Sequence, residues 1–125
     1  MEKHVLVVDD SPTLRASISF CLTNAGYRVS EAVNGQDGLA RLQEMESQKK
    51  LPALIISDVN MPEMDGITFI KEVKKTKLKF IPILVLTTES QEAQKLRGKS
   101  AGAAGWLLKP FRPEQLLWVV RKFVR

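Results

Sequence analysis

The chain of 125 residues has little of several features that would place it in a specialised class. It holds one cysteine, Cys21, so no disulfide can form within it, which fits a reducing setting. The helical spacing of Cys21 from Leu14, Ile18 and Ala25 predicts a small core residue. No apolar run approaches the ~20 residues of a membrane span, and the N-terminal stretch lacks the layout of a signal peptide. Low-complexity tracts, repeats and linkers are also absent, so we expect one cytoplasmic domain over 1–125 with no membrane partner.

The net charge of +5 is the bulk property that could indicate a nucleic-acid partner. The densest basic stretch, residues 71–79, has the sequence KEVKKTKLK and contains no aromatic residue on which a base could stack. No recognisable nucleic-acid-binding motif surrounds it. We therefore interpret it as a solvated helix end and expect no nucleic-acid partner, while the charge favours an acidic protein partner.

Short apolar runs alternate with stretches of helical spacing along the chain. The runs cover 4–8, 27–32, 53–57, 81–87 and 105–109. The helical stretches lie near 12–25, 36–48, 64–75, 90–100 and 113–124. Strands that are buried on both faces form continuous apolar runs, because helices cover both sides of a parallel sheet. The pattern predicts an α/β fold with one doubly wound, five-stranded parallel sheet and five helices.

Local signals for helix ends agree with this pattern. Ser11 followed by Pro12 predicts the N-cap and first turn of the first helix, and Gly26 is placed to end it. Asn34–Gly35 predicts the start of the second helix.

Polar residues collect at the carboxyl ends of the predicted strands, where open parallel sheets bind ligands. They are Asp9 and Asp10 after the first strand, Asp58 after the third, Thr87 and Thr88 after the fourth, and Lys109 after the fifth. If the first and third strands are adjacent, the three carboxylates converge on one site. An aspartate at a strand end could instead cap the next helix, but capping needs only one of them.

Three converging carboxylates carry an energetic cost that indicates a bound cation. At about 5 Å and an effective dielectric constant near 20, each pair repels by roughly 3 kcal/mol. A whole domain is stable by only ~5–15 kcal/mol, so such a cluster is expected to have a use. Mg²⁺ binds through one or two carboxylates and takes further ligands from phosphate oxygens. Lys109, fixed by Pro110, and Thr87 could then contact a transferring phosphoryl group.

Separated motifs along essentially the whole chain together resemble the receiver domain of two-component response regulators. They are Asp9–Asp10, Asp58, Asn60, the stretch MPEMDG, Thr87 and Lys109–Pro110. The stretch TTES and the run GKSAGAAGWLLKPF are similar to those of single-domain chemotaxis regulators of the CheY type. The resemblance implies a flavodoxin-like sheet of strand order 2-1-3-4-5. It also implies a phosphoacceptor that catalyses only its own phosphorylation and dephosphorylation, and is otherwise not an enzyme.

The resemblance implies a role for each carboxylate. Asp58 would accept the phosphoryl group. Asp10 would bind Mg²⁺ directly, Asp9 mainly through water while orienting Lys109, and Asn60 through its backbone carbonyl.

The resemblance also implies how phosphorylation would be sensed. Thr87 and Lys109 would contact the phosphoryl group, Thr88 would lie beside it, and the Lys109–Pro110 bond would be cis. A movement of Thr87 would open space into which Trp106 could rotate, where the family mostly has tyrosine or phenylalanine. Because an indole is larger, the amplitude of this switch could be smaller here.

Partners follow from the same resemblance. A CheA-like sensor histidine kinase would donate the phosphoryl group, and the 90–124 face would bind a target. The expected target is the flagellar motor switch protein or another protein, a phosphatase is a further partner, and the default state is a monomer. Lys95, Trp106, Arg121 and Lys122 would lie on the partner face.

The rate of dephosphorylation and the alternative functions complete the expectations. Asn60 and Glu89 lie where side chains would influence the attacking water and so tune the rate. The chain could instead be a phosphate sink, act outside motility, or bind a partner without signalling. A haloacid-dehalogenase-type phosphohydrolase is a further alternative, but its pattern separates two aspartates by one residue, whereas Asp9 and Asp10 are adjacent.

Overall fold

The computed structural model describes residues 3–61, 64–88 and 102–124. Within these residues, five strands and four helices follow one another along the chain. The strands are β1 (His4–Val8), β2 (Arg28–Ala32), β3 (Leu54–Asp58), β4 (Ile83–Thr87) and β5 (Gly105–Leu108). The helices are α1 (Pro12–Asn24), α2 (Gly35–Ser47), α3 (Gly66–Lys74) and α5 (Pro113–Phe123). The fifth predicted helix, near 90–100, lies outside the described residues.

The five strands form one parallel sheet in the order β2-β1-β3-β4-β5, which confirms the predicted order. Every residue of the three central strands β1, β3 and β4 is buried. The two edge strands are more exposed than their runs predicted, and Leu108 in β5 is half exposed. An edge strand has a neighbour on one side only, which explains the difference.

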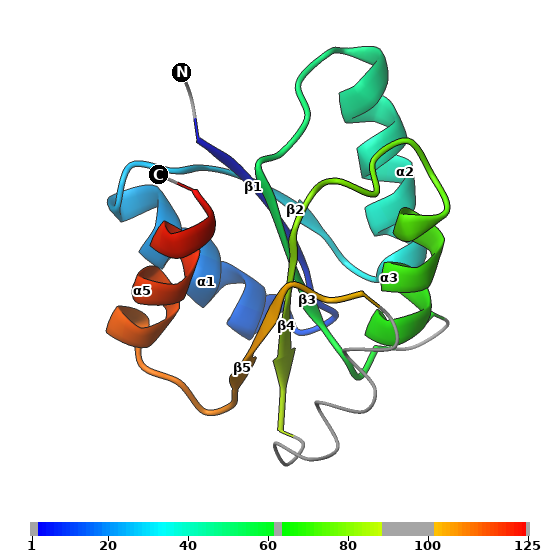
Figure 1. Cartoon of the computed structure of the whole chain (residues 1–125). Helices are drawn as coiled ribbons and strands as arrows, with labels where there is room; N and C mark the ends of the chain where they lie inside the picture. The colour runs from blue at the N-terminus through cyan, green and yellow to red at the C-terminus, as the bar shows by residue number, and fades with distance from the viewer. Residues whose placement is uncertain (1–2, 62–63, 89–101, 125) are drawn as a thin grey trace.

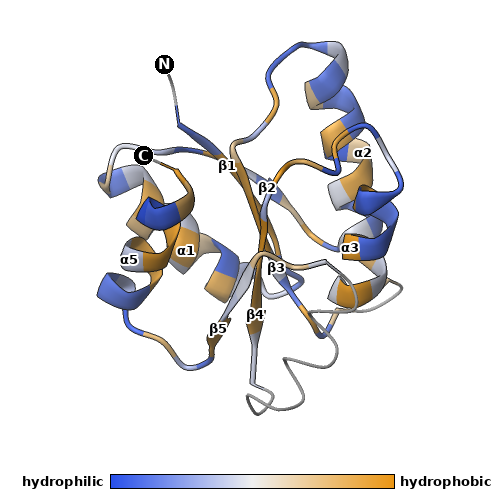
Figure 2. Cartoon of the chain, viewed as in Figure 1, coloured by the Kyte–Doolittle hydropathy of each residue, from blue (hydrophilic) through white to orange (hydrophobic). Residues whose placement is uncertain are grey.

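Helices cover both faces of the sheet. Figure 1 shows α1 and α5 on one face and α2 and α3 on the other. Figure 2 shows the apolar strands between these two helical layers, with polar residues on the outer sides of the helices. One buried cluster joins the sheet to α1 and α5 through Ile18, Leu22 and Leu116, and the other joins it to α2 and α3 through Leu42 and Phe69.

The predicted helix ends are confirmed. The hydroxyl of Ser11 accepts a hydrogen bond from the Leu14 amide at 3.2 Å, and Pro12 is the first residue of α1. Gly26 has a φ of 94°, the left-handed conformation that favours glycine after a helix. Asn34 caps α2 by accepting from the Asp37 amide at 2.8 Å.

One local expectation needs correction. Cys21 is only half-buried, and its Sγ lies 3.9 Å from the carbonyl oxygen of Pro113 at the start of α5. Ala25, which shares the predicted stripe, is exposed because α1 ends at Asn24. The other boundaries lie within two residues of the prediction, and β3 extends far enough to include Asp58.

The basic stretch 71–79 covers the end of α3 and the turns after it, as predicted. Lys71 and Lys75 are exposed, whereas Lys74 folds back and donates to the carbonyl oxygen of Lys79 at 2.8 Å. Burial lowers the pKa of Lys74. Among the described helices, none combines the length and the apolar composition required to cross a membrane.

Candidate functional site

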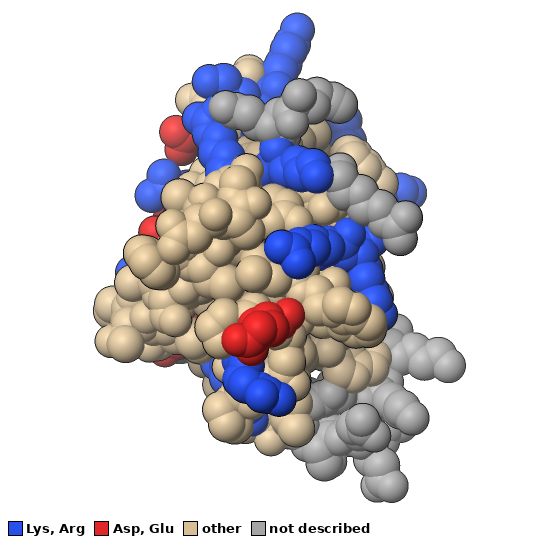
Figure 3. Space-filling model, turned by 90° about the vertical axis from the view of Figure 1, so that its left-hand side faces the viewer, with Lys and Arg blue, Asp and Glu red and all other residues tan. Residues whose placement is uncertain are grey.

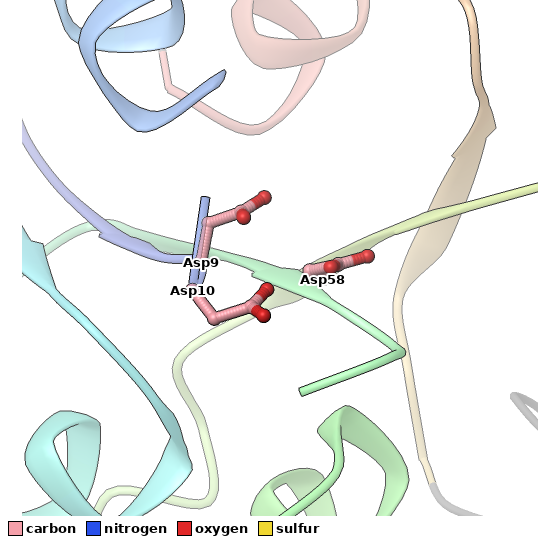
Figure 4. Close-up of side chains that lie close together, drawn as sticks. All are labelled: Asp9, Asp10 and Asp58. Carbon is pink, nitrogen blue, oxygen red and sulfur yellow. The ribbon is translucent and has the colours of Figure 1, made fainter. Parts of the chain in front are cut away.

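The register of the central strands brings the carboxylates together. Val8 of β1 lies beside Ser57 of β3, so the next residues along both strands, Asp9 and Asp58, emerge side by side at one edge of the sheet. Asp10 follows directly. One carboxylate oxygen from each of the three residues lies within 4.8 Å of the other two. Figure 4 shows the three side chains at the ends of the two strands, and the predicted convergence is therefore confirmed.

Asp58 is a buried carboxylate with fixed hydrogen-bond donors. Its side chain accepts from the amide of Val59 at 2.9 Å and from Nζ of Lys109 at 2.8 Å, and both bonds end on Oδ1. The residue is 5% exposed. The two donors hold the carboxylate in one orientation, and a carboxylate held in this way can act as a nucleophile.

Lys109 comes from the far end of β5 and links two of the carboxylates. Its Nζ also lies 4.0 Å from Oδ2 of Asp9. Its amide donates to the carbonyl oxygen of Thr87 at 2.8 Å, which ties the end of β5 to that of β4. The Lys109–Pro110 bond is cis, as the resemblance implied.

Asp9 differs from Asp58 in having a buried oxygen without a hydrogen-bond donor. Oδ1 accepts from the Ser11 amide at 2.8 Å, whereas Oδ2 is buried and makes no hydrogen bond. Burial is the main cause that raises the pKa of Asp9; the Ser11 bond opposes this rise and the charge on Asp58 adds to it. A buried anionic oxygen with no donor fits a cation. The three carboxylates therefore form a cluster that could hold a divalent metal ion.

The turn after β3 passes so close to the strand end that it requires glycine. The amide of Gly66, the first residue of α3, donates to the carbonyl oxygen of Val59 at 2.8 Å. A Cβ at position 66 would overlap the carbonyl oxygen of Asp58. The start of α3 thus packs directly against the backbone that carries Asp58.

Thr87 and Trp106 lie on the same face of the sheet. Trp106 is paired with Val85, and Thr87 is two residues further along β4, so their side chains project to the face covered by α2 and α3. Thr87 is buried, and Trp106 is half-buried against the core of that face. Thr88 is exposed and, with Lys109, lines one end of an apolar cavity of about 430 Å³ between α1 and α5.

The other predicted site residues lie around this centre. Asn60 is exposed just beyond Asp58. Arg121 and Lys122 are exposed on the last turn of α5, and Nζ of Lys122 lies 3.5 Å from the ring centroid of Trp118. Figure 3, which looks onto the side formed by α1 and α5, shows Lys and Arg side chains mainly in the upper and right-hand parts of this face, beside a broad uncharged area. The two remaining predicted residues, Glu89 and Lys95, lie outside the described residues.

Arg15 was missed by the sequence analysis. It contacts the end of β1 from the first turn of α1 by donating from Nη1 to the carbonyl oxygen of Asp9 at 2.7 Å. A sequence signal did exist. A cation near a helix N-terminus is unfavourable in itself, so an arginine in that turn suggests a tertiary partner.

Comparison with known proteins agrees with this geometry. The family model described as response regulator receiver domain matches residues 5–121. The chain belongs to this family. This receiver domain is 34% identical over 123 residues to the chemotaxis protein CheY of Thermotoga maritima, covering 98% of each chain. The membership decides against the haloacid-dehalogenase alternative.

Solved structures and longer relatives support the same conclusion. The receiver domain superposes on the structure of the chemotaxis response regulator CheY4 of Vibrio cholerae with a TM-score of 0.87 and 45% identity, covering 98% of this chain and 99% of that one. It is 38% identical over 122 residues to the sensor histidine kinase CheAY of Helicobacter pylori, but spans only 15% of that protein. The chain is thus a CheY-like receiver domain of a two-component response regulator.

Proposed function

We propose that this receiver domain accepts a phosphoryl group on Asp58 from a phosphohistidine of a CheA-like sensor histidine kinase. The observation that carries the proposal is the buried Asp58 carboxylate, held by Lys109 at 2.8 Å beside two further carboxylates. The similarity to proteins named as chemotaxis regulators supports the same role. Apart from its own phosphorylation and dephosphorylation, we propose no enzymatic activity.

The acidic cluster would hold Mg²⁺. Asp10 and Asp58 would bind it directly, Asn60 would contribute its backbone carbonyl, and Asp9 would act mainly through water. Bound Mg²⁺ would neutralise charge on the phosphoryl oxygens. The buried, unbonded Oδ2 of Asp9 is the feature of the chain that supports a cation here.

Asp58 performs the chemical step as the nucleophile. The Lys109 and Val59 bonds both end on Oδ1, so we expect Oδ2 to attack phosphorus. The bond from phosphorus to the kinase histidine breaks, and its electron pair returns to the imidazole nitrogen. The fold fixes the position of the acceptor carboxylate, and catalysis consists of positioning and charge stabilisation.

Lys109 and Thr87 stabilise the charge that spreads over the phosphoryl oxygens. The ammonium of Lys109 already lies on the Asp58 carboxylate, so little reorganisation is needed at the moment of transfer. Thr87 would donate its hydroxyl to the phosphoryl group, and Thr88 would border it from the exposed side.

The switch follows from the shared face of Thr87 and Trp106. Thr87 lies at the end of β4. When its side chain turns toward the aspartyl phosphate, it leaves space on the face where Trp106 packs. Trp106 is half-buried, so it can move further inward as well as outward. Phosphorylation would thereby shift the balance between two arrangements of this surface.

The altered surface would bind the target. We propose that the 90–124 face, with Lys95, Trp106, Arg121 and Lys122, engages an acidic segment of a flagellar motor switch protein. Exposed basic residues on α5 support an acidic partner. We propose further that the protein acts as a cytoplasmic monomer in which 1–125 is a single receiver domain.

Signalling would end by hydrolysis of the aspartyl phosphate. Water attacks phosphorus, the Asp58 carboxylate leaves with the electron pair, and inorganic phosphate is released. Asn60 and Glu89 would tune this rate, and a phosphatase would accelerate it.

Intact-mass spectrometry after incubation with Mg²⁺ and acetyl phosphate tests the proposal. We expect one added phosphoryl group on the unaltered chain, none on Asp58→Asn, and one on the control Asp37→Asn, whose carboxylate accepts from the Val33 amide and is not part of the acidic cluster. Tryptophan fluorescence in the same samples should change with phosphorylation. Absence of phosphorylation from several donors would overturn the proposal in favour of a module that only binds a partner.

A further inference from the structure

Arg15 joins three elements beside the acidic cluster. It is carried by α1, its Nη1 donates to the carbonyl oxygen of Asp9 at 2.7 Å, and its Nε donates to Oε1 of Glu31 at 3.0 Å. Glu31 belongs to β2, the strand next to β1. The Arg15 side chain is 15% exposed and that of Glu31 45%. Only a guanidinium, with its planar fork of donors, can make both bonds in this geometry.

The bond to the Asp9 carbonyl fixes the peptide group between Asp9 and Asp10. The amide of Asp9 donates to the carbonyl oxygen of Ala32 at 3.1 Å, so one side of Asp9 is held by β2. Arg15 holds the other side, from which Asp10 continues. Asp10 is exposed at this turn, and the direction of its side chain depends on the orientation of the preceding peptide group.

From this geometry we infer that Arg15 is a positioning residue for the divalent cation site. By clamping the Asp9–Asp10 peptide group, it holds the Asp10 carboxylate within reach of Asp9 and Asp58. The inference rests on the proposed function, because it concerns the cation that the cluster would bind. In this role Arg15 acts through the Asp9 backbone and is not itself a ligand of the cation.

Charge and geometry predict opposite effects of changing Arg15. If Arg15 acted only as a charge, its removal would reduce its repulsion of Mg²⁺, and Mg²⁺ would bind more tightly. If it positions Asp10, its removal weakens Mg²⁺ binding even though a positive charge has been lost. If it served only to stabilise the fold, the unfolding midpoint would fall while the Mg²⁺ affinity of the folded chain stayed unchanged.

Mg²⁺ affinity, measured by calorimetric titration of the full chain, separates these cases. For Arg15→Gln we expect affinity to fall about tenfold, the lower end of the effect of outer partners of metal ligands. Arg15→Lys keeps the charge but loses the fork, and should also bind more weakly. Glu31→Gln keeps the bond from Arg15 to Asp9, and its Mg²⁺ affinity should fall about two- to threefold. The control Arg41→Gln removes a surface arginine 3.8 Å from Asp37 and should bind as the unaltered chain does.

Two results would overturn the inference. Equal or tighter Mg²⁺ binding by folded Arg15→Gln, with normal binding by the unaltered chain, would overturn the role of Arg15 alone. No Mg²⁺ binding by the unaltered chain would overturn the proposed function and this inference with it. If Arg15→Gln fails to fold in a circular-dichroism check, Arg15→Lys decides in the same way, because it keeps the charge and removes only the fork.

Discussion

Asp9 and Asp58 stand at the ends of neighbouring strands, and both are buried, yet their surroundings differ. The Asp58 carboxylate accepts from a backbone amide and from the ammonium of Lys109. Asp9 has one oxygen bonded to the Ser11 amide and another that is buried without a donor. Lys109 lies 2.8 Å from Asp58 but 4.0 Å from Asp9.

This difference separates two tasks that identical side chains could perform. A carboxylate that accepts from a lysine ammonium and a backbone amide is held in one orientation and can serve as the nucleophile. A carboxylate with an unbonded buried oxygen is destabilised as an anion, and a cation can relieve that cost. These surroundings suit Asp58 to its proposed role as phosphoacceptor, whereas the buried, unbonded oxygen of Asp9 favours a cation beside it.

Among the substitutions that test this comparison, replacement of Lys109 by methionine should have the largest effect. We expect the rate of Asp58 phosphorylation by acetyl phosphate to fall by about 10²–10³, because the removed ammonium stabilises the transferring group. The rate is measured by intact mass over time. Lys74→Met serves as a control, since Lys74 donates to a backbone oxygen away from the site. A rate for Lys109→Met equal to that of the control would contradict the role given to Lys109.

Substitution of Gly66 by alanine tests the close packing of α3 against the end of β3, which carries Asp58. The new Cβ would overlap the carbonyl oxygen of Asp58, so we expect the free energy of unfolding to fall by about 3 kcal/mol. Gly105→Ala is the matched control, because its Cβ would meet its nearest neighbour, Phe123, at an ordinary 3.5 Å. Urea midpoints at an unchanged m-value measure both variants. Equal midpoints would show that the start of α3 can shift without cost.

Substitution of Asp9 by asparagine should change the free energy of unfolding by less than Gly66→Ala does, and should raise it. The raised pKa of Asp9 means that the folded chain binds this proton more tightly than the unfolded chain does. Without Mg²⁺, the stability of the unaltered chain therefore falls as the pH rises from about 3.9 through the folded pKa. Asp9→Asn removes this loss, so we expect it to be more stable by about 1 kcal/mol at neutral pH.

Urea unfolding at several pH values, with and without Mg²⁺, measures this effect. The control Asp65→Asn keeps a good helix cap on α3 and should leave stability nearly unchanged. Mg²⁺ should stabilise the unaltered chain more than Asp9→Asn. A loss of stability in Asp9→Asn at neutral pH without Mg²⁺ would show that the buried anion is already compensated.

Much of the fold could be predicted because the signals were local. The apolar runs gave the strands to within two residues, and Ser11, Pro12 and Gly26 marked the ends of α1. The edge strands were predicted less well, since a run of apolar letters does not show whether a strand has one neighbour or two. Cys21 was placed too deep for a similar reason: helical spacing gives a face, but not whether that face meets the sheet or another helix.

The site was predicted as a set of residues but not as a set of different environments. Aspartates and a lysine at strand ends were visible in the sequence, and so was the expectation that they would meet. The unbonded oxygen of Asp9 and the bond from Arg15 to the Asp9 backbone depend on the packing of α1 and β2 against β1. Sequence patterns contain no distances of this kind.

By itself, the sequence determined the alternation of strands and helices and the chemical groups at the strand ends, because periodicity and residue type are properties of the chain. Tertiary structure alone decided which carboxylate meets Lys109, which keeps a buried oxygen without a donor, and which arginine bonds to the carbonyl of Asp9. These outcomes depend on strand order and on contacts between residues far apart along the chain. The Nζ of Lys109 lies only about an ångström closer to Asp58 than to Asp9, and electrostatic energies in a buried site are sensitive to that difference.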